Sequence, residues 1–330
     1  MWQMAELNTV VHARFQDALG LLEPESVQLG FLSPPYENMT TYRDSDGKPI
    51  AGNTQSEMFI QEFWSDLFGK LKPVMKKTGI VAIVINDKQK DGVTLTTNLE
   101  GVIRVTKMGW HLIERVTWVK TTGIPTSPFR LQKWSEDIWL FSRSKRPKFY
   151  PDRIRGKYSQ ASIDRYVWGG GLVRKMAHSA QRNLSSGEKT VFATDDTERL
   201  QNKVVNIDVS KGKLLPNVLI ISPDCGRNEK HPARFPLNLP RWGITLCTDP
   251  GDLVIDPMCG SGTTLIAAKE MGRNYWGCDV GDAYVQMSLE GLERTVPGQL
   301  SIFGEEFQVP TPAIEHAPDY QEAVQELLNL

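Results

Sequence analysis

The sequence predicts an α/β fold with a doubly wound, mostly parallel sheet and a lobe inserted into it. Strand-like and helix-like segments alternate over residues 1–142, and the same alternation returns at residues 252–280. The basic stretch between them lacks a regular apolar period. Strands that alternate with helices are typical of parallel sheets covered on both faces. We therefore expect residues 1–142 and 216–330 to share one domain and residues 143–215 to form the lobe.

Apolar periodicity indicates the individual elements. Residues 56–75 and 281–295 carry apolar side chains at helical spacing, and the last ten residues suit a short helix. Residues 252–280 have the pattern strand, glycine-containing loop, helix and strand. Four further runs of strand length lie at residues 26–31, 79–86, 112–120 and 136–144.

The composition is that of an ordinary soluble globular protein, since 40% of the 330 residues are hydrophobic and 23% are charged. No apolar run reaches the ~18 residues of a membrane span, and the first residues lack the pattern of a secretory signal. The four cysteines, at positions 225, 247, 259 and 278, form no C-x-x-C pair. We therefore expect reduced thiols in a cytoplasmic protein, rather than disulfides or metal ligands.

The net charge of −1 hides a basic block. Between Phe141 and Thr190 the chain has 12 Lys or Arg against 3 Asp or Glu, a local balance of +9, so the remainder carries −10. A solvated surface loop is the simpler interpretation of such a run. The contiguity of the charge and the aromatic residues among it favour a surface that binds a polyanion.

The glycine-containing loop at residues 256–263, Asp-Pro-Met-Cys-Gly-Ser-Gly-Thr, follows a strand and opens a helix. Such a turn is where nucleotide-like ligands bind in open α/β sheets, and Gly260 and Gly262 allow a ligand to approach the backbone. Asp279 ends the next strand, 17 residues after Gly262, where a carboxylate can accept hydrogen bonds from both ribose hydroxyls. No G-K-[ST] follows, which excludes a P-loop. Two adenosine ligands remain, a nicotinamide dinucleotide and S-adenosylmethionine.

Ser33-Pro34-Pro35-Tyr36 follows the strand at residues 26–31. The prolines lack N–H groups, so this turn presents acceptors: the Ser33 hydroxyl and the carbonyls of Ser33 and Pro34. A rim of acceptors suits an amino group, and Tyr36 offers a face for stacking. Acceptors that hold both hydrogens of a nucleobase amine would localise its lone pair and direct it at a methyl group. The predicted chemistry is direct methyl transfer to a base turned out of the duplex.

These motifs, together with His-Pro-Ala-Arg-Phe-Pro at residues 231–236, resemble the DNA amino-methyltransferases, in the β-class order with the catalytic motif before the cofactor loop. The resemblance covers about residues 5–294 and implies a Rossmann-like, seven-stranded sheet with a target-recognition lobe at 143–215. A serine at the first motif position resembles the cytosine-N4 branch. S-adenosylmethionine is then the cofactor and double-stranded DNA the substrate. A restriction endonuclease as partner, and a monomer or a homodimer, stay open.

The resemblance also implies roles for individual residues. Ser33, Pro34, Pro35 and Tyr36 would bind the target base. The cofactor would be bound by His231, Pro232, Ala233, Asp256, Pro257, Met258, Cys259, Gly260, Ser261, Gly262, Thr263 and Asp279. The basic block supplies the expected DNA contacts, Arg143, Lys145, Arg146, Lys148, Arg153, Arg155 and Lys157. No metal site is expected.

Several alternatives stay open. Adenine-N6 methylation is the nearest, and a nicotinamide-dependent dehydrogenase or a catalytically silent DNA-binding module are alternatives of a different class. A cytosine-C5 mechanism is disfavoured, because neither Cys225 nor Cys259 lies in a Pro-Cys-Gln motif. Some relatives place a proton-accepting carboxylate where this chain has Val84. Asn86 and Asp87 are near it, and water is another acceptor.

Overall fold

The computed structural model describes residues 5–34, 42–43, 49–51, 60–87, 89–90, 92–120, 133–156, 216–223 and 235–298. The chain divides into two compact units, residues 1–153 with 216–330, and residues 154–215. Residues 143–153, which the sequence assigns to the lobe, are thus part of the first unit. The predicted C-terminal helix and most of the predicted lobe lie outside the described residues.

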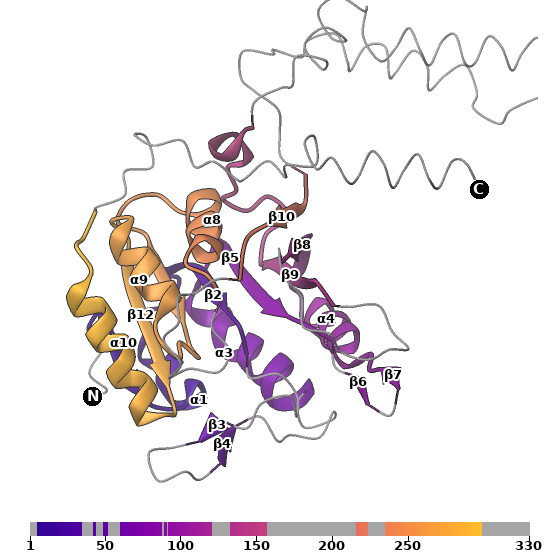
Figure 1. Ribbon diagram of the computed structural model, residues 1–330, viewed down its shortest axis with the longest axis horizontal. Coiled ribbons are helices and arrows are strands. Elements are labelled where there is room, and N and C mark those ends of the chain that lie inside the picture. The colour runs from indigo at the N-terminus through magenta and orange to yellow at the C-terminus, as the bar shows by residue number, and fades with distance from the viewer. Residues whose placement is uncertain are drawn as a thin grey trace, which may run out of the picture. The chain divides into compact units, whose positions relative to one another are not determined.

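An eight-stranded sheet forms the centre of the first unit (Figure 1). Seven of its strands share one direction, and β9 runs opposite to its neighbours β5 and β8. The mostly parallel α/β fold is confirmed, although the described part of the sheet has eight strands where seven were expected. In spatial order the strands are β1 (Thr9–His12), β12 (Asn274–Asp279), β11 (Leu253–Asp256), β2 (Val27–Leu32), β5 (Met75–Ile85), β9 (Ser135–Ser142), β8 (His111–Val119) and β10 (Val218–Ile220).

Helices cover both faces of the sheet, as a doubly wound fold requires. One group of three helices packs together: α8 (Asn238–Cys247) against β2 and β5, α9 (Thr263–Glu270) against β11 and β12, and α10 (Asp282–Arg294) against β12 and the edge strand β1. The second group contains α1 (Phe15–Ala18), η1 (Leu19–Leu21), the π-helix η2 (Ile60–Asp66), α3 (Leu67–Val74) and α4 (Thr97–Lys107). Smaller elements are the pairs β3 (Tyr42–Arg43) with β4 (Pro49–Ala51) and β6 (Gln89–Lys90) with β7 (Val93–Thr94), and η3 (Pro151–Ile154).

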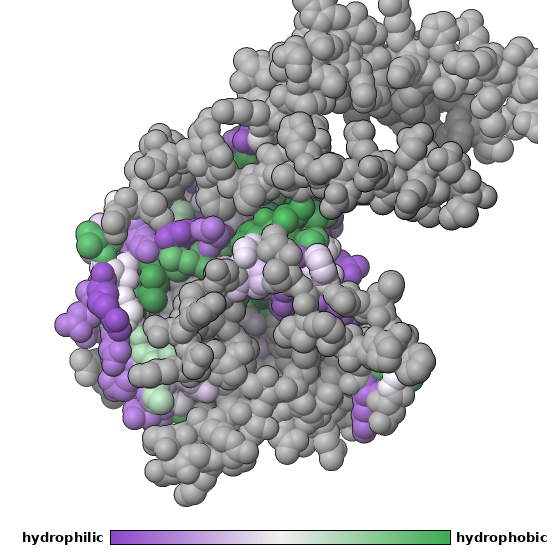
Figure 2. All heavy atoms as spheres, in the orientation of Figure 1, coloured by the Kyte–Doolittle hydropathy of each residue, from purple (hydrophilic) through white to green (hydrophobic). Residues whose placement is uncertain are grey.

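The core lies against the central strands. All six residues of β2 are buried, and β5 is buried from Ile80 to Ile85, because strands covered on both faces are continuously apolar. Beneath them, Phe68 makes edge-to-face contacts with Trp110 and Phe141, at centroid distances of 5.2 and 5.1 Å. Figure 2 shows polar side chains along the α10 edge of the first unit and apolar ones gathered further inward. No helix among the described residues is long and apolar enough to cross a membrane.

Candidate active site

The carboxyl ends of three neighbouring strands bring the predicted motifs together. In the register of the sheet, Gly30 of β2 pairs with Ile255 of β11, and Leu32 pairs with Ile83 of β5. Ser33 follows β2 directly, and it is half-buried, while Pro34 is buried. The loop after β11 therefore begins beside the last residues of β2, at the edge where parallel α/β sheets bind ligands.

The loop after β11 is a tight turn that needs glycine. Gly260 and Gly262 have φ angles of +51° and +78°, in the left-handed region that other residues rarely adopt. A Cβ atom on Gly262 would lie 2.8 Å from the hydroxyl of Ser288 on α10. Backbone bonds close the turn, from Gly262 N–H to the Cys259 carbonyl at 2.8 Å and from Cys259 N–H to the Cys278 carbonyl at 3.0 Å.

Asp279, at the end of β12, faces this loop. Its carboxylate accepts hydrogen bonds from the N–H groups of Gly260 and Gly281, each at 2.9 Å. Burial raises the pKa of Asp279, although these N–H donors and the nearby His12 oppose the rise. Each carboxylate oxygen keeps acceptor capacity beyond one N–H bond. An oriented carboxylate beside a glycine turn fits the ribose of an adenosine ligand.

Two buried hydroxyls that are not among the predicted site residues also support the loop. Ser288 is fully buried, and its hydroxyl donates to the Gly260 carbonyl at 2.7 Å. Thr264 is also fully buried, and its hydroxyl donates to the Phe31 carbonyl on β2 at 3.1 Å. Each bond joins residues far apart in the chain, so apolar periodicity could not reveal it.

A polar network lies at the carboxyl end of β5. The side-chain amide of Asn98 donates to the Asn86 carbonyl at 3.0 Å and to the Asp87 carboxylate at 3.1 Å. The ammonium of Lys133 donates to the Asn86 side chain at 3.2 Å and to the Asp87 carbonyl. Val84, where some relatives carry a carboxylate, is buried at 1% exposure. Asp87 is therefore held close to the end of β5, one strand away from Ser33.

Of the predicted DNA-contacting residues that the structure describes, Arg143, Lys148 and Arg153 pair with carboxylates or carbonyls of the first unit. Arg143 donates to the Met75 carbonyl at 2.9 Å and to Glu25 at 3.2 Å. Lys148 and Arg153 belong to a cluster around two aspartates, described next. Lys145 and Arg146 are exposed, and Arg155 is half-buried. A role of these residues in DNA binding stays a prediction.

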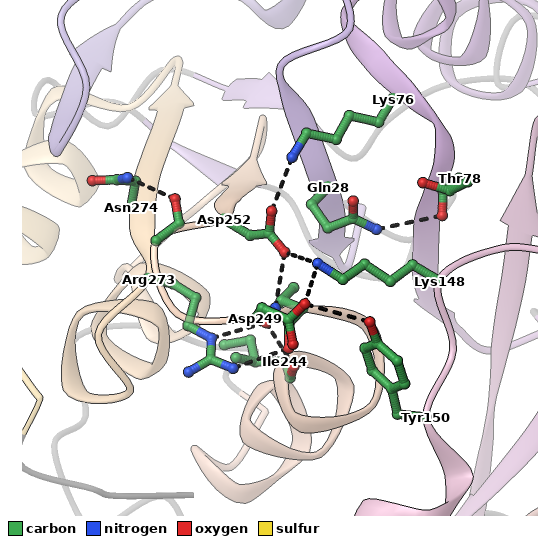
Figure 3. Close-up of polar contacts among 12 residues, drawn as sticks. Gln28, Lys76, Thr78, Lys148, Tyr150, Ile244, Asp249, Asp252, Arg273 and Asn274 are labelled. Carbon is green, nitrogen blue, oxygen red and sulfur yellow. Dashed lines mark hydrogen bonds and ion pairs between the residues drawn. The ribbon is translucent and has the colours of Figure 1, made fainter.

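Figure 3 shows the cluster at the opposite, amino end of the parallel strands. Asp252 directly precedes β11, and it accepts from Lys76 of β5 at 2.9 Å and from Lys148 at 2.5 Å. Lys148 also pairs with Asp249 at 2.6 Å, and Arg153 pairs with the second oxygen of Asp249. The hydrogen bond from Lys148 and then that from Arg153 lower the pKa of Asp249 to about 2.

The distance between this cluster and Ser33 follows from the geometry of β2. The strand has six residues, and a rise of about 3.3 Å per residue separates its two ends by roughly 20 Å. Lys148 and Arg153 therefore attach the chain after β9 to the amino edge of the sheet, away from the candidate active site.

Several predicted site residues lie outside the described part of the chain: Pro35, Tyr36, Lys157, His231, Pro232 and Ala233. Phe235, at the end of the His-Pro-Ala-Arg-Phe-Pro motif, is described. Its ring contacts the ring of Phe31 edge to face, at a centroid distance of 5.8 Å. This motif therefore ends beside the strand that leads to Ser33.

Comparisons with known proteins agree with this arrangement. The family model N6_N4_Mtase, described as DNA methylase, matches residues 27–290. The type II methyltransferase M1.MboII of Moraxella bovis is 27% identical over 287 residues, which cover 86% of this chain and 96% of that protein. The type II methyltransferase M.PvuII of Proteus hauseri is 26% identical over 288 residues, 82% of this chain and 80% of that protein.

Solved structures show the same fold. The cytosine-N4-specific PvuII DNA methyltransferase superimposes with a TM-score of 0.61 at 19% identity, covering 91% of this chain and 90% of that one. A putative DNA modification methylase of Thermus thermophilus, TTHA0409, was solved in complex with S-adenosyl-L-methionine. It has a TM-score of 0.52 at 20% identity, covering 88% of this chain and 95% of that one.

Proposed function

The chain belongs to the N6/N4 family of DNA methylases, and from this premise we propose that it methylates the exocyclic N4 amine of cytosine in double-stranded DNA, with S-adenosylmethionine as methyl donor. The observation that carries the proposal is the adjacency of β2 and β11. Ser33 and Pro34 follow one strand, and the loop beginning at Asp256 ends the other. A methyl donor in the loop and an amine at Ser33 would then be neighbours.

The chain's own groups would orient the reaction. The Ser33 hydroxyl and the Pro34 carbonyl would accept hydrogen bonds from the two amine N–H groups, which localises the nitrogen lone pair and aims it along the line of transfer. As the new N–C bond forms, the amine loses one proton, for which water or the Asp87 carboxylate would be the acceptor. Asp279 binds the ribose hydroxyls, and the turn at Gly260 lets the nucleoside approach the backbone. When bound, S-adenosylmethionine supplies an electrophilic methyl group. The base must leave the duplex to reach this pocket, and Tyr36 is the proposed stacking partner.

A covalent cysteine mechanism does not fit the described cysteines. Cys247, Cys259 and Cys278 are free and buried. Burial raises the pKa of Cys259 and Cys278 well above that of an ordinary thiol. A thiol that does not ionise is a poor nucleophile, and this favours direct transfer to an amine over attack on a ring carbon.

Two features favour cytosine over adenine: the serine at position 33 and the 26% sequence identity to the PvuII methyltransferase, a cytosine-N4-specific enzyme. The decisive experiment treats unmethylated bacterial genomic DNA with the protein and labelled S-adenosylmethionine, then identifies the labelled nucleoside after digestion. N4-methylcytosine is expected. N6-methyladenine as the sole product would show that the target base is adenine and would leave the mechanism of direct transfer to an amine unchanged. 5-Methylcytosine would refute that mechanism.

The type II names of its relatives place those proteins in restriction–modification systems. We propose the same context for this chain, with action on DNA in the bacterial cytoplasm. Sequencing that detects methylated bases in cells expressing the protein would identify the recognition site. Methylation at scattered positions without a common sequence would contradict a site-specific enzyme.

A further inference from the structure

Thr264 connects the two halves of the candidate active site. It is the second residue of α9, the helix that the cofactor loop opens, and its side chain is fully buried. Its hydroxyl donates to the carbonyl of Phe31, which lies two residues before Ser33, although the two residues are 233 positions apart in the sequence. The bond thus runs from the donor side of the site to the strand that ends at the acceptor side.

Asp256, the last residue of β11, interacts with the same hydroxyl. Its carboxyl group is 2% exposed, accepts from the Met258 N–H at 3.1 Å and shares a hydrogen bond with Thr264. Burial raises the pKa of Asp256 to about 7. The bond with Thr264 opposes this rise, because a hydroxyl that donates to a carboxylate favours its ionised form. The single hydroxyl hydrogen of Thr264 therefore lies between two acceptors, Asp256 and the Phe31 carbonyl. The Thr264 hydroxyl on α9 thus interacts with one group at the end of β11 and one on β2.

Both the ring and the backbone carbonyl of Phe31 have close contacts. The ring meets Phe235 edge to face, and a Cβ atom on Gly243 of α8 would lie 2.7 Å from it. Little space is therefore left for this segment of β2 to shift sideways. The Thr264 bond adds a restraint between α9 and this segment of β2.

We propose that Thr264 is a positioning residue for methyl transfer, whose hydroxyl sets the spacing between the cofactor loop and Ser33. This inference rests on the proposed function, because the spacing matters only if a methyl group crosses it. Misplacement by a fraction of an ångström slows an in-line transfer while leaving most binding contacts intact. Loss of the hydroxyl should therefore affect the rate of transfer more than cofactor affinity.

The test compares Thr264→Val, which keeps the shape and removes the hydroxyl, with Thr264→Ser, which keeps the hydroxyl. Single-turnover methylation of unmethylated genomic DNA gives the rate, and calorimetry gives the S-adenosylmethionine affinity. We expect Thr264→Val to lower the rate by about 10–100-fold with affinity changed less than about threefold. Thr264→Ser should restore the rate to within about threefold of wild type.

Thr245→Val is the matched control. Thr245 is buried at 4% exposure on α8, and its hydroxyl donates to the Arg241 carbonyl of its own helix at 2.8 Å. The Thr245→Val substitution thus removes a buried threonine hydroxyl outside the candidate active site. It should leave the rate of methyl transfer within about twofold of wild type. If Thr264→Val fails to fold, Thr264→Cys, with a weak donor of similar size, must show the same selective loss of rate.

The outcomes separate the two proposals. A wild-type protein that methylates no DNA amine would refute the proposed function. A methylating wild type together with a Thr264→Val variant of undiminished rate would refute only the positioning role. So would a Thr264→Val variant whose loss of rate is matched by its loss of cofactor affinity, or a Thr264→Ser variant as slow as the valine variant.

Discussion

The carboxylate of Asp279 accepts a 2.9 Å hydrogen bond from the backbone N–H of Gly260, in the middle of the predicted cofactor loop. Its other oxygen accepts from Gly281 at the same distance. The side chain predicted to bind ribose therefore also holds the loop in shape. Cofactor affinity and the stability of the protein without cofactor should depend on this one carboxylate.

Asp279→Ala should weaken S-adenosylmethionine binding by about 1.5–3 kcal/mol, because it removes a pair of charge-assisted hydrogen bonds to the ribose. It should also lower the melting temperature of the cofactor-free protein, since Gly260 loses its acceptor. Calorimetry and thermal unfolding measure the two effects. Asp282→Ala, an exposed residue at the start of α10, is the control. Tight nicotinamide dinucleotide binding without any response to S-adenosylmethionine would refute this assignment.

Ser33→Ala should lower the rate of methyl transfer and leave the S-adenosylmethionine affinity nearly unchanged. The hydroxyl is proposed to act on the reacting amine, so its contribution appears mainly in the transition state. Ser26→Ala is a matched control, because Ser26 is also half-buried and lies just before the other end of β2. A parallel loss of rate and cofactor affinity in Ser33→Ala would indicate a role in folding the loop instead.

Asp256→Asn should stabilise the protein increasingly as the pH rises. The folded-state pKa of Asp256 is raised to about 7, above the ordinary value near 3.9, so the folded state holds its proton more tightly. The free energy of unfolding of the wild type therefore falls between about pH 4 and pH 7, and asparagine removes this dependence. The expected difference is near zero at pH 4 and grows to at most ~4 kcal/mol at pH 8.

Denaturant unfolding at pH 5 and pH 8 measures this difference. The side-chain oxygen of asparagine can still accept from the Met258 N–H and from the Thr264 hydroxyl, so the fold should be kept. The control is Asp282→Asn on the surface. A stability difference that is the same at both pH values would show that Asp256 does not titrate in this range.

Lys148→Met should lower the free energy of unfolding by about 1–2 kcal/mol, because it leaves Asp249 and Asp252 without a shared partner. A lysine that contacts a DNA phosphate also contributes about 1 to the slope of log affinity against log salt. We expect Lys148→Met to leave that slope unchanged, because the ammonium is already paired at the amino edge of the sheet.

Lys145→Met is the matched control, since Lys145 is exposed and three residues away. It should leave the free energy of unfolding unchanged. If Lys148→Met reduces the salt slope by about 1 and keeps full stability, the DNA contact predicted from the sequence is correct and the ion pairs are dispensable.

Local patterns were sufficient for the central elements of the fold. The apolar run at residues 26–31 is β2, the segment at 252–280 is β11, its loop, α9 and β12, and the helix at 281–295 is α10. These elements are buried along one whole face or on both faces. Their apolar residues therefore recur in the sequence with the period of a helix or a strand. The short edge strands β1 and β10 were missed. They have four and three residues, which are too few to show a periodic pattern of apolar side chains.

By itself, the sequence determined the α/β class and predicted the cofactor loop and the motif at Ser33, because each depends on residues close together in the chain. Only the tertiary structure decided which of these groups meet. The Thr264 hydroxyl donates a hydrogen bond to the Phe31 carbonyl, 233 positions away in the sequence. The Lys148 ammonium pairs with Asp252, 104 positions away. Charge counting could not tell a lysine facing a phosphate from one facing a carboxylate, because the partner is chosen by the order and register of the strands.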